Sequence, residues 1–387
     1  MKPYLKIIII AVIVIVAGLL VYLGWTWLTS APPTPTPTSS APYFPLAGLT
    51  STSTGTTASA SPSTTTGPIG TLTQASDKPV SFFWTDPTTG EVFYLDQKGI
   101  VWQAEAGQKN PQITPQGVAA VNFIEQSPDG EFVLAAFGNP SAPSWGIYDV
   151  VDQVWSPLPG NIIQATWGAD SHTLIATETS GSGINLVSLD VSQSPPKTKL
   201  ITTNFNFLDA RFAFEPPSTL LIIEKGSASY GGHIWSFNLK TSALNLLIGP
   251  QNGLTARLTS DNSTLITYSA AGGFQLLNSN TLQNLAPLPF LTLPQKCSVN
   301  SGTTVYCFVP TNPDFKSATL PDDYFERKIY TTDVLYGINT KTGASTLIPL
   351  PPNALGGLDG EKPALAGQVL YFVDRLNGYL YSLNLGV

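Results

Sequence analysis

The same order of short apolar strands and tight polar turns recurs seven times along residues 69–387. The first tight turn of most units follows that of the preceding unit by roughly 40–47 residues, and the sixth unit has a longer interval. Four strands in about 40–45 residues are typical of one β-propeller blade. The units begin at Val80, Ala119, Ile162, Phe207, Gly253, Lys296 and Lys362. The sequence therefore predicts an all-β fold, a seven-bladed propeller with four-stranded antiparallel blades.

Other architectures explain this pattern less well. No segment of 69–387 has a sustained 3.6-residue apolar period, so helices are not expected there. A β-sandwich also contains many short strands, but the regular four-strand order favours blades. The seventh unit has only three strands before the sequence stops at Val387. Because an open edge strand invites aggregation, we expect residues 69–75 to close the ring as the missing outer strand of the last blade.

The first residues have the pattern of a membrane anchor. Residues 7–23 carry no charge, and Trp25 and Trp27 follow them. About 17–25 apolar residues span a bilayer as a helix, and Trp favours the interface. Lys2 and Lys6 precede the apolar run, which predicts a cytoplasmic N-terminus and an extracytoplasmic remainder. Residues 1–28 are thus expected to be a single-pass cell-membrane anchor; a cleaved signal peptide is the alternative, and it also exports the rest.

Residues 29–68 have the composition of a linker. They consist almost entirely of Thr, Ser, Pro, Ala and Gly, interrupted by one apolar island at 43–46. Such a segment has too little apolar surface to offset its ordering entropy. We expect a disordered tether that holds a propeller of residues 69–387 away from the membrane.

Composition excludes several classes of function. The formal net charge is −7, which argues against a nucleic-acid partner. Two His, one Met and two Cys leave little material for metal or redox chemistry, so no cofactor is expected. The two cysteines, Cys297 and Cys307, flank a hairpin turn and should face each other on neighbouring strands. Because an exported domain lies where disulfides persist, we predict a disulfide between them; a pair of buried thiols is the alternative.

Two motifs resemble known propellers. The sequence SPDG at 127–130, followed by an apolar strand, resembles the WD40-like repeats of TolB-type periplasmic proteins. The segments 296–300, 305–310, 320–325 and 332–343 are similar to one blade of uncharacterised membrane-anchored envelope propellers from candidate-phyla bacteria. This resemblance implies architecture and location but no chemistry. No Trp-Asp dipeptide ends a blade, so the hydrogen-bond tetrad of eukaryotic WD40 repeats is not implied.

Long loops in three units contain the candidate ligand-binding residues. Ordered loops are where binding residues concentrate, and aromatic and Arg side chains dominate protein interfaces. The alternative is that the rings cap the blade edges and shield the core. The candidates are Trp145 in the second unit, Tyr230 and His233 in the fourth, and Phe315, Tyr324, Phe325 and Arg327 in the sixth.

Acidic residues in the sixth loop are a weaker candidate site. Asp314, Asp322 and Asp323, with Glu326 and Asp333, could supply oxygen ligands to Ca²⁺, but their spacing matches no calcium loop. Lys316, Arg327 and Lys328 lie among them, which favours a solvated loop with ion pairs instead.

No motif for catalysis is present, and we expect no enzyme. There is no G-x-S-x-G elbow, and neither His172 nor His233 has a nucleophile placed beside it by a motif. The sequence favours a binding or scaffolding module for a protein or polysaccharide at the cell envelope. One alternative is a glycan-active enzyme that uses loop carboxylates. The other is a structural subunit of an envelope complex, which should show an apolar patch on its outer strands.

Overall fold

The computed structural model describes residues 70–386 except Pro87, Ala119, Ser182, Leu208, Asn300, Ser301, Leu355 and Gly356. All these residues belong to one compact unit, Thr64–Val387. The predicted anchor at 1–28 and linker at 29–68 lie outside the described residues. Within the described part of the chain, no helix is both long and apolar enough to cross a bilayer.

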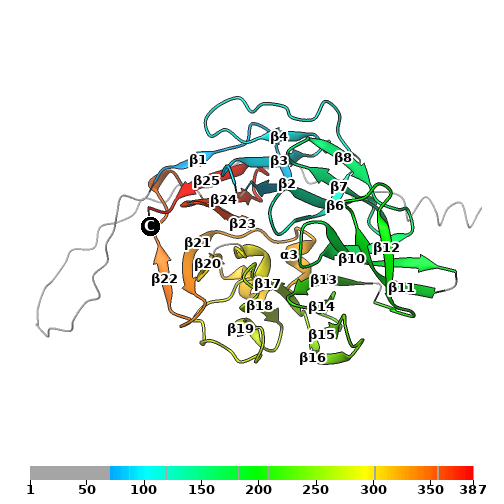
Figure 1. The fold of residues 1–387 in the computed structure, drawn as a ribbon. Coiled ribbons are helices and arrows are strands. Elements are labelled where there is room, and N and C mark those ends of the chain that lie inside the picture. Colours follow the sequence, from blue (N-terminus) through cyan, green and yellow to red (C-terminus); the bar gives the residue numbers. More distant parts are fainter. Residues whose placement is uncertain are drawn as a thin grey trace, which may run out of the picture. The chain divides into compact units, whose positions relative to one another are not determined.

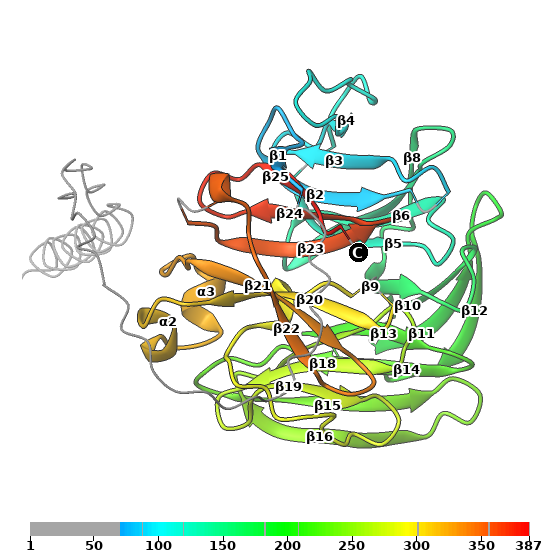
Figure 2. The ribbon, with the colours of Figure 1, turned by 90° about the vertical axis from the view of Figure 1, so that its left-hand side faces the viewer.

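Seven antiparallel sheets follow one another along the described chain and form the blades of a propeller (Figures 1 and 2). The strands of the first three blades are β2 (Val80–Thr85), β3 (Val92–Asp96) and β4 (Val101–Gln103); β5 (Val121–Gln126), β6 (Phe132–Asn139), β7 (Ala142–Asp149) and β8 (Val154–Pro157); and β9 (Ile162–Trp167), β10 (Thr173–Ser180), β11 (Gly183–Asp190) and β12 (Lys197–Thr202).

The remaining four blades complete the ring. Their strands are β13 (Ala210–Glu215), β14 (Thr219–Glu224), β15 (Gly231–Asn238) and β16 (Leu244–Asn252); β17 (Thr255–Leu258), β18 (Thr264–Ser269) and β19 (Gly273–Asn278); β20 (Thr304–Pro310), β21 (Asp333–Asn339) and β22 (Ser345–Ile348); and β23 (Gly360–Ala366), β24 (Val369–Asp374) and β25 (Leu380–Asn384). Short helices are η1 (Pro294–Lys296), α2 (Asp314–Ser317), α3 (Asp322–Phe325) and η2 (Pro352–Ala354).

The ring closes as the sequence predicts. Strand β1 (Leu72–Gln74) pairs antiparallel with β25, with Leu72 opposite Leu383, and gives the last blade the order β1-β25-β24-β23. Leu72 is buried in the cluster between the sixth and seventh blades. The N-terminal segment of the domain therefore supplies the outer strand of the C-terminal blade.

The core lies between the blades. Each pair of neighbouring blades encloses one apolar cluster, and an eighth cluster lies beneath the long connection of the sixth blade. All residues of β3 and β18 are buried. Because a blade packs on a neighbour with both faces, its middle strands are apolar on both sides, which explains the continuous β-branched and aromatic runs.

Four strands per blade is confirmed for blades two, three, four and seven. In blades one, five and six, one strand is reduced to a single bridge, respectively Trp102–Gln112, Leu277–Asn284 and Cys297–Cys307. Prolines flank these shortened strands, and proline cannot donate to a strand ladder. They are Pro111 and Pro115, Pro287 and Pro289, and Pro294.

The predicted disulfide is confirmed. Cys297 and Cys307 are bonded, with their Cα atoms 4.1 Å apart, and both residues are fully buried. The bond joins the shortened inner strand of blade six to β20, so it holds a segment that has only one bridge to the sheet.

Candidate functional site

Two of the long loops meet on one side of the propeller. The connection between β20 and β21, residues 311–332, carries α2 and α3 and is called the insertion below. The carboxylate of Asp322 in α3 accepts hydrogen bonds from the Ser227 hydroxyl (2.9 Å) and the Ala228 backbone N–H (3.1 Å). Both donors belong to the β14–β15 loop, so Asp322 joins connections from blades four and six.

Three of the predicted ligand-binding rings are buried, which corrects their assignment. Trp145 is 6% exposed, and its indole N–H donates to the Ile163 carbonyl at 3.1 Å. Phe315 and Tyr324 are 1% and 2% exposed and form the cluster beneath the insertion. The three rings cover the core, as expected from the alternative that they cap the blade edges. Their apolar area is therefore not available to a ligand.

The other predicted residues remain accessible. Tyr230 and Phe325 are 51% and 47% exposed. Arg327 is also exposed, and its Nη2 lies 3.7 Å from Glu361 Oε1. His233 is half-buried, with Nδ1 2.6 Å from Glu224 Oε2. Tyr230 and Phe325 therefore lie on the two connections that Asp322 joins, whereas His233 belongs to a separate contact on blade four.

The acidic residues of the insertion serve its own structure. Asp323 accepts a hydrogen bond from the Thr319 backbone N–H at 2.7 Å and lies 3.6 Å from Lys328. Asp322 contacts the β14–β15 loop as described, and Asp314 lies at the start of α2. Among the residues that the structure describes, no group of three or more His, Cys, Asp or Glu side chains is placed to hold a metal.

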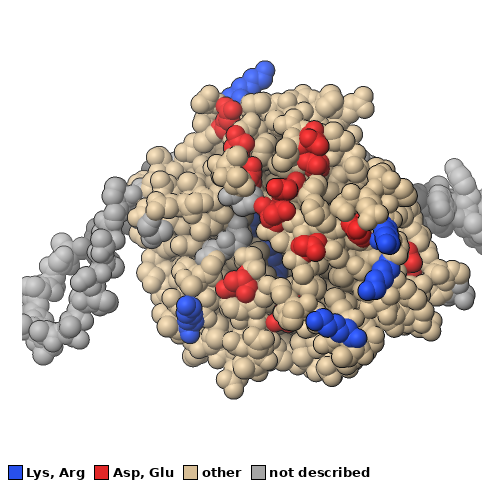
Figure 3. Space-filling view, in the orientation of Figure 1, with Lys and Arg blue, Asp and Glu red and all other residues tan. Residues whose placement is uncertain are grey.

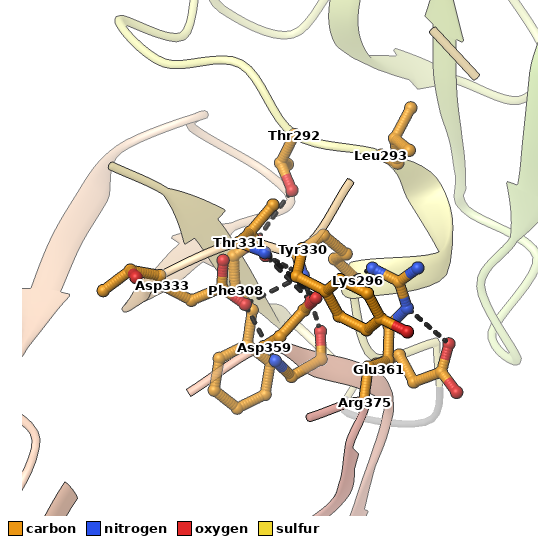
Figure 4. Close-up of polar contacts among 12 residues, drawn as sticks. Thr292, Leu293, Lys296, Phe308, Tyr330, Thr331, Asp333, Asp359, Glu361 and Arg375 are labelled. Carbon is orange, nitrogen blue, oxygen red and sulfur yellow. Dashed lines mark hydrogen bonds and ion pairs between the residues drawn. The ribbon is translucent and has the colours of Figure 1, made fainter. Parts of the chain in front are cut away.

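A buried ionic network lies under the insertion (Figure 4). Lys296 Nζ is 2.8 Å from Asp333 Oδ2 and 2.7 Å from Asp359 Oδ1, and all three side chains are fully buried. Arg375 bonds the other Asp359 oxygen at 2.8 Å and donates to the Tyr324 carbonyl at 2.8 Å. The network therefore ties the insertion to blade seven.

Charge pairing keeps the centre of this network ionised. Burial disfavours the ammonium form of Lys296, but the carboxylates of Asp333 and Asp359 raise its pKa above the ordinary value. The four charged residues come from η1, β21, the start of blade seven and the turn after β24. No local sequence pattern connects these positions, so the network could not be predicted from the sequence.

Comparisons with known proteins show the fold. No family model matches the chain, and no curated protein matches it. The WD40 repeats of RRP9 superpose with a TM-score of 0.52 at 11% identity over 82% of this chain and 98% of that one. The Cps50 (Swd1) propeller domain from Myceliophteria thermophila gives 0.51 at 10% identity over 82% and 99%. Oligogalacturonate lyase from Vibrio parahaemolyticus gives 0.51 at 11% identity over 82% and 91%.

These matches show that the chain has a β-propeller fold similar to that of WD40 repeats. At such low identity they show the fold alone, and the similar structures include an enzyme as well as WD40 repeats. The narrower resemblance to TolB-type proteins and to candidate-phyla envelope propellers stays a prediction.

Proposed function

We propose that the chain is a membrane-anchored extracytoplasmic binding or scaffolding module whose ligand is a protein or polysaccharide of the cell envelope. The ligand docks on the surface formed by the β14–β15 loop and the insertion. The observation that supports this most is the Asp322 contact, which joins connections from two blades that each carry an exposed aromatic ring, Tyr230 and Phe325.

The chemistry of this surface suits recognition. Exposed aromatic rings offer a large contact area at a low entropic cost, and Arg327 adds planar hydrogen-bond donors. Phe315 and Tyr324 support the insertion from below, and Arg375 binds its backbone. A surface held in this way loses little conformational freedom when a ligand binds.

One observation bears on the alternative that the chain is a structural subunit of an envelope complex. Exposed leucines lie on outer strands: Leu200 on β12, Leu244 and Leu246 on β16, and Leu347 on β22. They lie on blades three, four and six.

A pull-down from native envelope with the full chain tests the ligand-binding surface. The parent is compared with a Tyr230→Ala/Phe325→Ala variant and with a matched Leu200→Ala/Leu347→Ala control. We expect the first variant to lose the captured ligand and the control to keep it. If only the Leu200→Ala/Leu347→Ala variant lost the ligand, the structural-subunit alternative would be favoured. Equal capture by all three proteins would contradict the proposed surface.

A labelling experiment tests the location separately. A membrane-impermeant amine reagent applied to intact cells should modify exposed domain lysines such as Lys199 and Lys240. Modification only after lysis would show that the domain is cytoplasmic. A lysine-rich cytoplasmic protein in the same cells is the control for leakage.

A further inference from the structure

The innermost strands bring three cationic side chains to the axis of the propeller. Arg211 lies on β13, Arg257 on β17 and Lys362 on β23. We call the space enclosed by the seven innermost segments the axial channel. Figure 3 shows a hollow near the middle of one face, with acidic side chains around it and basic side chains in its depth.

Strand register places the two arginines at neighbouring levels of this channel. Arg257 pairs with Ile266, the third residue of its blade's second strand. Arg211 pairs with Ile223, the fifth residue of the corresponding strand. A difference of two residues is about 7 Å along a strand. It places Arg211 nearer the face that carries the β14–β15 loop.

The arginine side chains are surrounded by protein and still reach solvent. The Arg211 side chain is exposed to solvent and the Arg257 side chain is partly exposed, although both residues lie on innermost strands. The Arg211 guanidinium lies 5.5 Å from the Phe123 ring of blade two, across blade three. Both observations place the side chain in the channel, open to a small solute.

The cations lack adequate counter-charges. Arg257 donates to the Cys297 carbonyl at 3.0 Å, a neutral acceptor. Lys362 donates to the Ser81 carbonyl at 2.9 Å, and its nearest carboxylate oxygen, on Glu361, is 4.0 Å away. Within the described chain, no hydrogen bond or ion pair holds the Arg211 guanidinium. Burial, together with the charge of Arg211, lowers the pKa of Arg257 to about 10.

Glu125 is the carboxyl group that faces Arg211, and it compensates the charge only in part. Its Oε1 accepts a hydrogen bond from Thr166 at 2.8 Å, and no described donor reaches its buried Oε2. Burial raises the pKa of Glu125 to about 7. Near neutral pH this side chain is therefore partly protonated, and the protonated form would donate a hydrogen bond from Oε2.

A structural role explains only part of this arrangement. Arg257 and Lys362 each bond the backbone of the next blade, which stabilises the ring. Arg211 makes no such bond, and its solvent-exposed guanidinium keeps its donors free for a solute. Arginine pairs bind oxyanions through charge-assisted, often bidentate hydrogen bonds. The whole chain carries a net charge of −7, so positive charge concentrated in the channel is a local exception that attracts anions.

We propose that the axial channel binds an oxyanion, a phosphate or carboxylate group, between Arg211 and Arg257, with Lys362 adding positive charge. The site is independent of the Tyr230 and Phe325 surface. Its ligand is a free polyanion or the acidic group of a larger molecule that enters from the face carrying the β14–β15 loop.

Calorimetric titration of the full chain with inorganic phosphate and, separately, with citrate tests this site at constant ionic strength. At least one probe should bind saturably with a stoichiometry near one. Arg211→Gln should weaken that binding roughly 10- to 100-fold, the loss expected for a hydrogen bond to a charged group. Lys199→Gln, at an exposed position of β12, removes the same charge and should leave the affinity unchanged.

The two probes distinguish the sources of the oxyanion. Tighter binding of phosphate indicates a phosphorylated ligand, and tighter binding of citrate indicates a polycarboxylate. Because Arg211 bonds no backbone, its variant should keep the parent's melting temperature without a probe, and Arg257→Gln is the second variant. Absence of saturable binding for both probes, or equal affinity of the parent and both arginine variants, would overturn the proposal.

Discussion

Replacing Lys296 by Met should destabilise the domain strongly. The ammonium group has four buried partners: Asp333, Asp359, the Thr331 hydroxyl at 3.0 Å and the Gly360 carbonyl at 3.0 Å. Its removal leaves the Asp333 carboxylate without a cation, while Asp359 keeps Arg375. Breaking a buried ion pair from one side costs about 3–5 kcal/mol, and we expect that loss in the free energy of unfolding.

A double-mutant cycle identifies the cause of this loss. Asp333→Asn alone should cost about 1–3 kcal/mol, because Lys296 keeps Asp359. The Lys296→Met/Asp333→Asn double variant should be at least as stable as Lys296→Met, since the uncompensated carboxylate is gone. Urea unfolding followed by tryptophan fluorescence gives all four stabilities.

The control for this cycle is Lys328→Met, whose exposed ammonium pairs with Glu326 at 2.5 Å. It should leave the unfolding midpoint unchanged. Limited proteolysis of residues 311–332 gives a local readout, because the network holds the insertion and its loss should speed cleavage there. Additivity of the two single variants within about 0.5 kcal/mol would refute the assigned ion-pair network.

Three further predictions concern closure, the disulfide and the channel. Leu72→Ala should lower the free energy of unfolding by about 2–4 kcal/mol, and exposed Leu376→Ala by less than about 0.5 kcal/mol, in urea unfolding. Replacing Cys297 and Cys307 by Ser should cost about 2–3 kcal/mol, measured against the parent with and without reductant; no difference would contradict a stabilising bond. Since the Glu125 pKa is raised on folding, the parent should lose about 1–2 kcal/mol as pH rises from about 4.5 to 7, and Glu125→Gln should not.

Features of the fold that depend on a local sequence pattern were predicted best. The recurring order of short apolar strands and tight polar turns located the blades, and an incomplete last unit pointed to strand β1 as the closing strand. The hairpin between Cys297 and Cys307 placed two thiols opposite each other, which needs no knowledge of other blades. Strand reduction at Gln112, Asn284 and Cys297 was missed, because proline weakens a strand without abolishing its position.

The candidate site was predicted less well, because the burial of a loop side chain depends on segments that are distant in the sequence. Trp145, Phe315 and Tyr324 carry the same sequence signal as Tyr230 and Phe325, an aromatic ring in a long loop. Packing of the insertion against neighbouring blades decides which rings are covered. The contact of Asp322 with Ser227 joins residues 95 positions apart and has no counterpart in either loop alone.

The sequence by itself determined the all-β class, the seven blades, the closing strand and the disulfide, since each depends on short apolar runs, the recurrence of turns or a short hairpin. Only the tertiary structure decided which aromatic rings remain exposed, how Lys296 is neutralised and that Arg211 and Arg257 share one channel. The physical reason is that a propeller brings the inner strands of all blades to one axis. Side chains far apart in the chain thereby face one another without leaving a pattern in the sequence.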